Sequence, residues 1–250
     1  MRVTMRPGFG RVFLAELYKA ACSLTVWVVM GATVVAVCVF SYAVGVPGPQ
    51  TASMLAMLLG VCVMGAEYPS GAIVASLVAA ADRRRLLGAQ VCCVTVMAAL
   101  PVVVAMLAMI AVSNPYTNFE GTPLSTAESI ALAARMGLLL TLVALVGGFL
   151  SVLLRSALSA MILALLVIGG GQLLLILVPW LLTGGGSGGL LLPEWVNAVL
   201  PNAVFTRLLG GDFAIWSSWW DSPGMTYVEA LAWVAPAACG AYWRMIHADF

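Results

Sequence analysis

Long apolar runs dominate the chain, and short polar or glycine- and proline-containing stretches separate them. These runs predict six helices, over residues 23–45, 50–66, 86–112, 130–154, 157–182 and 226–243. Most are long enough for a transmembrane helix, which rises ~1.5 Å per residue and needs about 20 residues to cross the hydrocarbon core. They lack the alternation of apolar and polar residues that is typical of membrane β-barrel strands. The pattern therefore predicts an all-α integral membrane protein with six transmembrane helices.

Two shorter segments, residues 1–22 and 67–85, do not fit the spanning pattern. The first has an apolar stripe at helical spacing, formed by Phe9, Val12, Phe13 and Leu17. Its charged residues fall largely elsewhere around the helix, and these are Arg11, Glu16 and Lys19. We expect an amphipathic interfacial helix that lies flat on the inner leaflet, with its basic groups near anionic headgroups. A cytoplasmic extension of the first spanning helix is the alternative.

The second segment is a short predicted helix between a turn and a cluster of charges. Pro69, Ser70 and Gly71 turn the chain, and residues 72–81 are small or branched and apolar. The run ends in a charged cluster made of Asp82, Arg83, Arg84 and Arg85. It is too short to cross a bilayer and too apolar for a freely solvated loop, so we expect it along the interface. Taken alone, the arginines also fit a positive-inside stop signal with no further role.

Residues 183–225 form the longest predicted non-spanning segment. Only its glycine tract is typical of a flexible linker. Its aromatic residues are of the kind that settle at the membrane–water boundary, and they include Trp195, Phe205, Phe213, Trp216, Trp219 and Trp220. A partly embedded, re-entrant hairpin and a simple aromatic belt on an extracytoplasmic loop both fit. Earlier in the chain, Ser125 and Glu128 have the spacing of a capping box at the start of the fourth span, although an ordinary solvated loop fits too.

Composition supports the membrane assignment. The chain of 250 residues is 63% hydrophobic and 8% charged, whereas roughly 25% of the residues of an ordinary soluble domain are charged. The six cysteines lie mostly in apolar runs without paired metal-ligand spacing, and the chain has one histidine. We therefore expect buried thiols rather than a metal centre or disulfides.

The basic residues predict an orientation, because cytoplasmic loops retain positive charge. With both termini inside, the cytoplasmic segments hold Arg2, Arg6, Arg11, Lys19, Arg83, Arg84, Arg85, Arg155 and Arg244, and the other side keeps Arg135 and Arg207. Six spans with cytoplasmic termini describe a multi-pass protein of the plasma (inner) membrane.

Motifs for catalysis are absent from the sequence. It has no phosphate-binding loop of the Walker type, and its single lysine follows Tyr18. One histidine cannot supply a paired-histidine metalloprotease motif. Asp and Glu are almost missing from the predicted spans, which disfavours an ion-coupled carrier. We expect a chain that is not an enzyme and binds no cofactor itself.

The order of these features resembles the permease subunits of ABC-2 type transporters, over essentially all of residues 1–250, as a single transmembrane domain. In that family a glutamate leaves the second span and is followed by a Gly-Thr pair and a short helix. That helix ends in an arginine-containing segment with a lysine downstream. Glu67, Gly71 and the arginines 83–85 match, while Ala72 stands at the threonine and Gln90 near the lysine.

The resemblance implies a function as the membrane subunit of an ATP-binding cassette exporter. Residues 67–85 would contain a coupling helix that docks on a separate ATPase, through Glu67, Gly71, Asp82, Arg83, Arg84 and Arg85. Two copies of that ATPase would carry ATP and Mg, and a second permease chain, identical or not, would complete the pathway. Glu67 would lie at the hinge and pair with an arginine of the same loop or of the N-terminal segment; interfacial capping is the alternative.

The cargo suggested by a lining without fixed charge is apolar or amphipathic, such as a drug, peptide or lipid. Two other functions remain open at this level: a membrane scaffold or immunity protein that transports nothing, and an ion-coupled secondary carrier. No nucleic-acid partner is expected.

Overall fold

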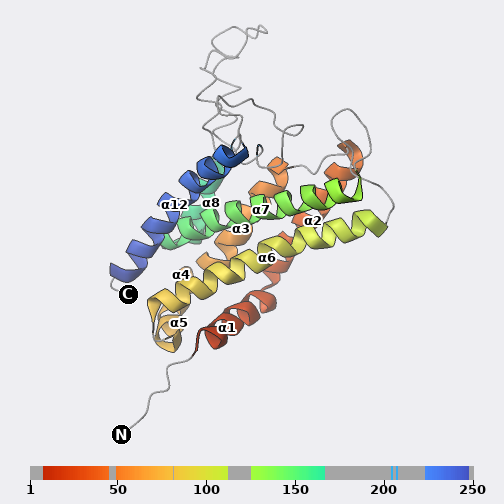
Figure 1. The fold of residues 1–250 in the computed structure, drawn as a ribbon. Coiled ribbons are helices and arrows are strands. Elements are labelled where there is room, and N and C mark those ends of the chain that lie inside the picture. Colours follow the sequence, from red (N-terminus) through yellow and green to blue (C-terminus); the bar gives the residue numbers. More distant parts are fainter. Residues whose placement is uncertain are drawn as a thin grey trace, which may run out of the picture.

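The computed structural model describes residues 8–44, 49–80, 82–111, 125–166, Val204, Arg207 and 223–247, and these residues are almost entirely helical. The longer helices are α2 (Leu24–Val44), α3 (Pro49–Gly65), α6 (Arg83–Ala111), α7 (Thr126–Leu154) and α12 (Pro223–His247). The shorter ones are α1 (Phe9–Cys22), α4 (Glu67–Ser70), α5 (Ala72–Ala80) and α8 (Ala157–Leu165). The long helices form a bundle, with α1, α4 and α5 gathered at one end (Figure 1).

Three helical segments are long and apolar enough to cross a membrane: Thr51–Ser70, Arg83–Ala108 and Thr126–Leu154. A fourth span is counted if the bent pair of α1 and α2 crosses as one unit. The all-α membrane class is thus supported, while the full set of six spans stays a prediction. The predicted span 157–182 is described only as far as residue 166, and most of segment 183–225 lies outside the described residues.

Helices α3 and α7 pack closely because glycines line their contact. A Cβ atom on Gly60 would overlap the carbonyl oxygen of Ala144, and one on Gly147 would overlap that of Met57. Small residues let two helix backbones approach in this way, which is a common basis of association inside a membrane. This pair forms the centre of the buried core, in which Met57, Leu139 and Leu140 are almost fully buried.

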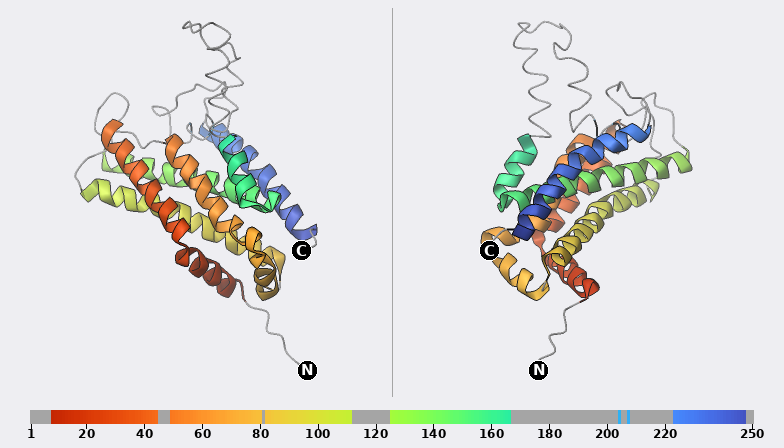
Figure 2. Two further views of the ribbon diagram at one scale, coloured as in Figure 1. Left: turned by 180° about the vertical axis from the view of Figure 1, so that it is seen from behind. Right: turned by 60° about the vertical axis from the view of Figure 1, so that its left-hand side comes forward.

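Helix α1 meets α2 at a bend of 74°. Ser23 has an extended backbone and ends α1, and the Trp27 indole N–H donates to the Ala21 carbonyl oxygen across the bend at 2.7 Å. A straight extension of the first span is therefore not what the structure contains. Figure 2 shows α1 turned away from the axis of α2 at the lower end of the bundle. Its position on a membrane surface stays a prediction.

The two faces of α1 differ from the expected ones. Part of the predicted apolar stripe packs inward, since Val12 is buried, and the inward face also carries Glu16. The outward side exposes Leu14 and Tyr18 instead. Glu16 therefore points into the protein, and the expected placement of the basic groups of α1 near lipid headgroups stays a prediction.

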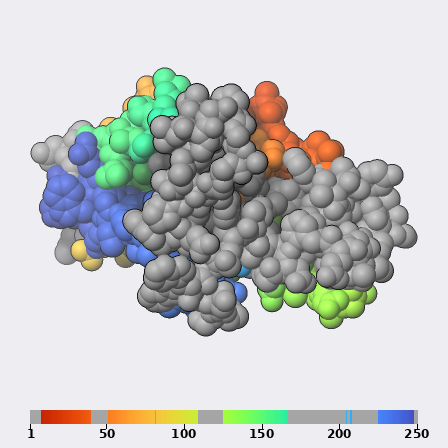
Figure 3. All heavy atoms as spheres, turned by 90° about the horizontal axis from the view of Figure 1, so that it is seen from above, coloured from red at the N-terminus to blue at the C-terminus, as the bar shows by residue number. Residues whose placement is uncertain are grey.

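Local signals explain several boundaries. The side chain of Ser125 accepts from the Glu128 backbone N–H, and the Glu128 carboxylate accepts from the Ser125 N–H, so the predicted capping box at the start of α7 is confirmed. At the opposite end of that helix, Arg155 turns the chain into α8. Seen from above, α12 and α8 lie at one side of the described part and α2 at the other (Figure 3).

Candidate functional site

The predicted coupling loop forms two short helices at one end of the bundle. Gly71 ends α4 with a φ of 69°, a left-handed conformation that glycine adopts without steric cost, and its N–H donates to the Tyr68 carbonyl oxygen. Helix α5 then runs from Ala72 to Ala80, as predicted from the short apolar run. The loop therefore leaves α3, reverses at Gly71 and enters α6 within a few turns (Figure 1).

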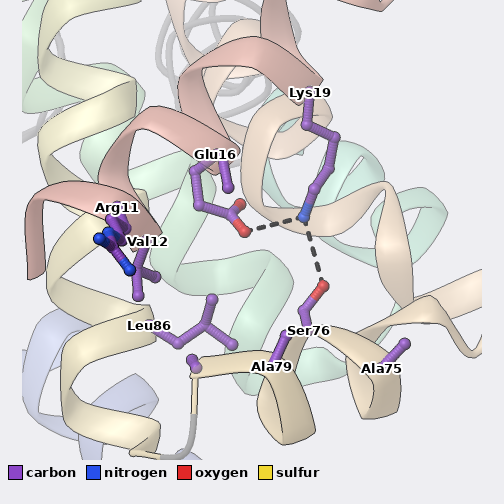
Figure 4. A pocket seen from close by; sticks show the side chains of 10 residues that line it. Arg11, Val12, Glu16, Lys19, Ala75, Ser76, Ala79 and Leu86 are labelled. Atoms are coloured by element: carbon purple, nitrogen blue, oxygen red, sulfur yellow. Dashed lines mark hydrogen bonds and ion pairs between the residues drawn. The ribbon is translucent and has the colours of Figure 1, made fainter. Parts of the chain in front are cut away.

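A partly buried ion cluster joins this loop to α1. The Lys19 Nζ donates to Glu16 Oε1 at 2.8 Å and also contacts Glu67 Oε1 directly. Ser76 of α5 contributes its hydroxyl, which donates to Glu67 Oε1 at 2.9 Å and accepts from the Lys19 Nζ at 3.3 Å. Figure 4 shows Glu16, Lys19 and Ser76 pointing toward one another from α1 and α5. Three segments that are far apart in the sequence thus share one set of polar contacts.

The two carboxylates of the cluster are much less accessible than the ammonium. The Glu16 and Glu67 side chains are 7% and 6% exposed, whereas Lys19 is 45% exposed. When all three groups are ionised, the cluster carries one excess negative charge next to the protein interior. A buried uncompensated charge is costly, so these carboxylates depend strongly on Lys19.

Burial also shapes the ionisation of the α1 groups. Desolvation raises the pKa of the Glu16 carboxyl, although the hydrogen bond and the charge of Lys19 act in the opposite direction. Desolvation acts to lower the pKa of the Lys19 ammonium, but the hydrogen bonds and charges of Glu16 and Glu67 outweigh it and raise that pKa. The ammonium form of Lys19 is therefore firmly held by its two partners.

Two further polar groups reach this region without a complete set of hydrogen bonds. Glu67 Oε2 is buried and has no hydrogen-bond partner among the described residues. Gln90 of α6 is almost fully buried, and its amide forms no hydrogen bond among the described residues. The amide is still close enough to Glu16 to act toward a lower pKa of the Glu16 carboxyl. Gln90 is the position that stands near the lysine of the ABC-2 pattern, and it belongs to the surroundings of this cluster.

A groove of about 450 Å³ opens between α1 and α5 above the cluster. Its lining is made of small apolar residues with polar groups at one edge, and Arg11, Glu16, Lys19, Ser76, Ala79 and Leu86 take part (Figure 4). Beside it, α5 exposes apolar side chains: Val78 is 76% exposed and Val74 is 47% exposed. This outer face of α5 is apolar and close to the charged start of α6.

The arginines of the charged cluster at residues 82–85 make two kinds of contact, with α12 and with Asp82. Arg83 donates to the Met245 and Ile246 carbonyl oxygens at 3.0 and 3.1 Å, and the Arg84 guanidinium lies 5.8 Å from the centre of the Tyr242 ring. Arg85 instead pairs with Asp82 at 3.4 Å in its own turn. The start of α6 thus contacts the end of α12, and Arg84 is the most exposed of the three arginines by residue class.

The structure pairs Glu67 with a cation of the N-terminal segment, while its place at a hinge stays a prediction. The partner of Glu67 is Lys19, rather than the arginine that was predicted. Ser76 and Gln90 were not predicted as part of the site. Ser76 is a lone polar residue in the apolar run of α5, and Gln90 stands near the lysine of the ABC-2 pattern, and these were the available signals.

The charged segments that were predicted to be cytoplasmic gather at one end. Contacts of Lys19 with Glu67, and of Arg83 with the last turn of α12, bring α1, the loop and the C-terminal helix together. Arg155 lies near Tyr68 of α4. At the other end of α12, Arg207 pairs with Glu229 at 2.7 Å. This arrangement agrees with the predicted alternation of sides, while the side of a membrane on which each end lies stays a prediction.

A second groove, of about 420 Å³, lies between α6 and α7. Its lining is apolar apart from one hydroxyl and contains Val102, Met106, Ile130, Leu138 and Thr141 among other residues. Among the described residues there is no group of three or more histidine, cysteine or acidic side chains that could hold a metal ion. Among the described residues, the ion cluster is the set of polar side chains that joins α1 to the loop.

No protein-family model matches the chain, and no curated protein matches its sequence. The fold and the geometry of the loop are therefore the observations on which a function can be proposed.

Proposed function

We propose that the chain is the membrane-spanning permease subunit of an ATP-binding cassette exporter, and that α4 and α5 form the element by which a separate ATPase moves it. The observation that carries the proposal is the attachment of this loop. It is joined covalently to α3 and α6, and the cluster of Lys19, Glu16 and Glu67 holds it to α1. A force applied to α5 would be transmitted to all three helices together.

The exposed face of α5 supports a protein partner at this point. Val74 and Val78 expose apolar surface on a helix too short to span a membrane, and the exposed Arg84 lies at the start of the next helix. A groove with an apolar floor and an acidic rim would complement such a surface, because interfaces combine an apolar core with a charged rim. In this proposal ATP and Mg are bound by two copies of the partner, and the chain itself binds no nucleotide.

The cargo in this proposal is apolar or amphipathic. The groove between α6 and α7 has no charged side chain in its lining, which suits a drug-like, peptide or lipid-like molecule better than an ion. Six helices would supply half of a pathway, so the working unit would contain a second permease chain. The plasma membrane, with both termini on the cytoplasmic side, is the location that the distribution of basic residues supports.

A paired substitution tests the proposed docking surface. Val78→Glu places a charge on the exposed face of α5, and Val228→Glu places the same charge on a position of α12 that is 55% exposed near the other end of the bundle. The wild-type chain and the Val228→Glu variant should co-purify with an ATP-hydrolysing subunit in mild detergent, and Val78→Glu should lose it while staying inserted. Equal recovery of the ATPase with both variants, or none with the wild type, would contradict the proposal.

A further inference from the structure

The C-terminal end of α12 is capped by a side chain from another helix. The last carbonyl groups of a helix have no partner within it. Here Arg83 Nη1 donates to two of them, on Met245 at 3.0 Å and on Ile246 at 3.1 Å, across more than 160 residues of sequence. A cation at a helix C-terminus also interacts favourably with the partial negative charge there. Arg83 therefore satisfies and holds the last turn of α12.

Neighbouring contacts strengthen this junction. The Arg84 guanidinium lies 5.8 Å from the centre of the Tyr242 ring, within the range of a cation–π contact, and Met245 is 1% exposed. Arg85, by contrast, pairs with Asp82 inside the first turn of α6. Arg83 and Arg84 thus contact α12, whereas Arg85 pairs with Asp82, the residue just before α6.

We propose that Arg83 is a positioning residue that ties the end of α12 to the coupling loop, so that a displacement of the loop moves this end of α12 together with α6. The movement of the loop rests on the proposed function, whereas the contact between Arg83 and the end of α12 does not depend on that function. Both helices contain an internal proline, Pro101 in α6 and Pro236 in α12. Proline removes one backbone hydrogen bond and is a common site of helix bending. Beyond Pro236, α12 contacts α7 through Gly240, which lies against Leu153, and it also contacts Arg83, so a bend at Pro236 would let this part follow the loop.

Hydrogen–deuterium exchange on the isolated chain in nanodiscs tests the tie. Arg83→Gln should speed exchange of the backbone amides in the last turn of α12 by about ten-fold, which is the scale expected when hydrogen bonds from a charged group are lost. Arg83→Lys keeps a cation that can donate to the same carbonyls and should restore most of the protection. Arg85→Gln is the matched control and should leave the last turn unchanged. Equal exchange in Arg83→Gln and Arg85→Gln would overturn the proposal.

A distance measurement in the assembled complex tests the transmitted movement. Spin labels at Arg244→Cys on α12 and Leu158→Cys on α8, in a chain whose six native cysteines are replaced, report how the end of α12 moves when ATP binds. Arg83→Gln should reduce that nucleotide-dependent shift by at least half, and Arg83→Lys should restore it. An undiminished shift in Arg83→Gln would overturn the transmitted movement. A chain that binds no ATPase would contradict both this movement and the proposed function, and the exchange result would still decide whether Arg83 holds α12.

Discussion

Replacing Lys19 by Met should release the coupling loop from α1. The substitution keeps a long apolar stem but removes the only positive charge that contacts both Glu16 and Glu67 in the described structure. Breaking a buried ion pair by removing one partner typically costs about 3–5 kcal/mol. The Lys19 side chain is 45% exposed, so water partly replaces it, and we expect a smaller loss of about 2 kcal/mol. That corresponds to roughly a 30-fold shift toward the detached state.

The matched control is Arg11→Met on the same helix. Arg11 lines the same groove and is exposed, and no ion pair of it is present among the described residues. The assay is thermal unfolding of the purified chain in nanodiscs, with hydrogen–deuterium exchange of α1 and α5 as a local readout. Lys19→Met should lower the midpoint and speed exchange in both helices, whereas Arg11→Met should change little.

A second substitution checks the charge argument. The cluster has two carboxylates for one ammonium, so Glu67→Gln leaves a balanced pair of Glu16 and Lys19 and should cost much less than Lys19→Met. The double variant Lys19→Met/Glu67→Gln should recover part of the lost stability, because it removes one of the two carboxylates left unpaired. If Lys19→Met proved as mild as Arg11→Met, or if the double variant were additive, the ion cluster would not hold the loop.

Three further outcomes follow from the structure. Gly60→Ala should weaken the α3–α7 contact by about 1–3 kcal/mol, because its new methyl group meets a backbone carbonyl. Gly137→Ala on α7 is the control, since the site has open space and the change should be neutral or stabilising. Equal melting temperatures of the two variants would contradict this. Ser125→Ala should remove the cap of α7 at a cost of about 1 kcal/mol, measured by exchange of the first turn, and unchanged protection there would exclude a stabilising cap. Glu16 has a raised pKa, so its contribution is complete below its ordinary value of 4.5 and is lost as the pH rises through the raised value. The protection of α1, taken relative to the intrinsic exchange rate at each pH, should therefore be higher at mildly acidic pH, and a Glu16→Gln variant that keeps this pH dependence would contradict the reasoning.

Local elements of the loop were predictable because their signals are local. Gly71 ends α4 in a left-handed conformation, a short apolar run gives α5, and the serine–glutamate spacing gives the cap of α7. In each case a few adjacent residues contain all the information. The reversal at Gly71 and the short helix after it therefore followed from the sequence, whereas α4 forms where only a turn was predicted and α6 begins at Arg83 rather than at residue 86.

The contacts between distant segments were not predictable in the same way. Several basic residues precede the first span, and nothing in their spacing says that Lys19 rather than Arg11 reaches Glu67. The 74° bend at Ser23 turns α1 so that Lys19 faces the loop, and a serine is not by itself a helix breaker. The partners of Arg83 are backbone carbonyls, which have no sequence signature at all. These features depend on how the helices pack and so require the structure.

The most direct test of the account is a site-specific photocrosslink from α5 in native membranes. A photoreactive residue at Val78, which is 76% exposed, is compared with one at Val228 near the opposite end of the bundle. We expect the residue at Val78 to form an adduct with a protein that mass spectrometry identifies as an ATP-binding cassette ATPase, and the residue at Val228 to form none. An α5 that crosslinks only to lipid, or an ATPase that is captured from Val228 instead, would contradict the claim that this loop is where the chain is driven.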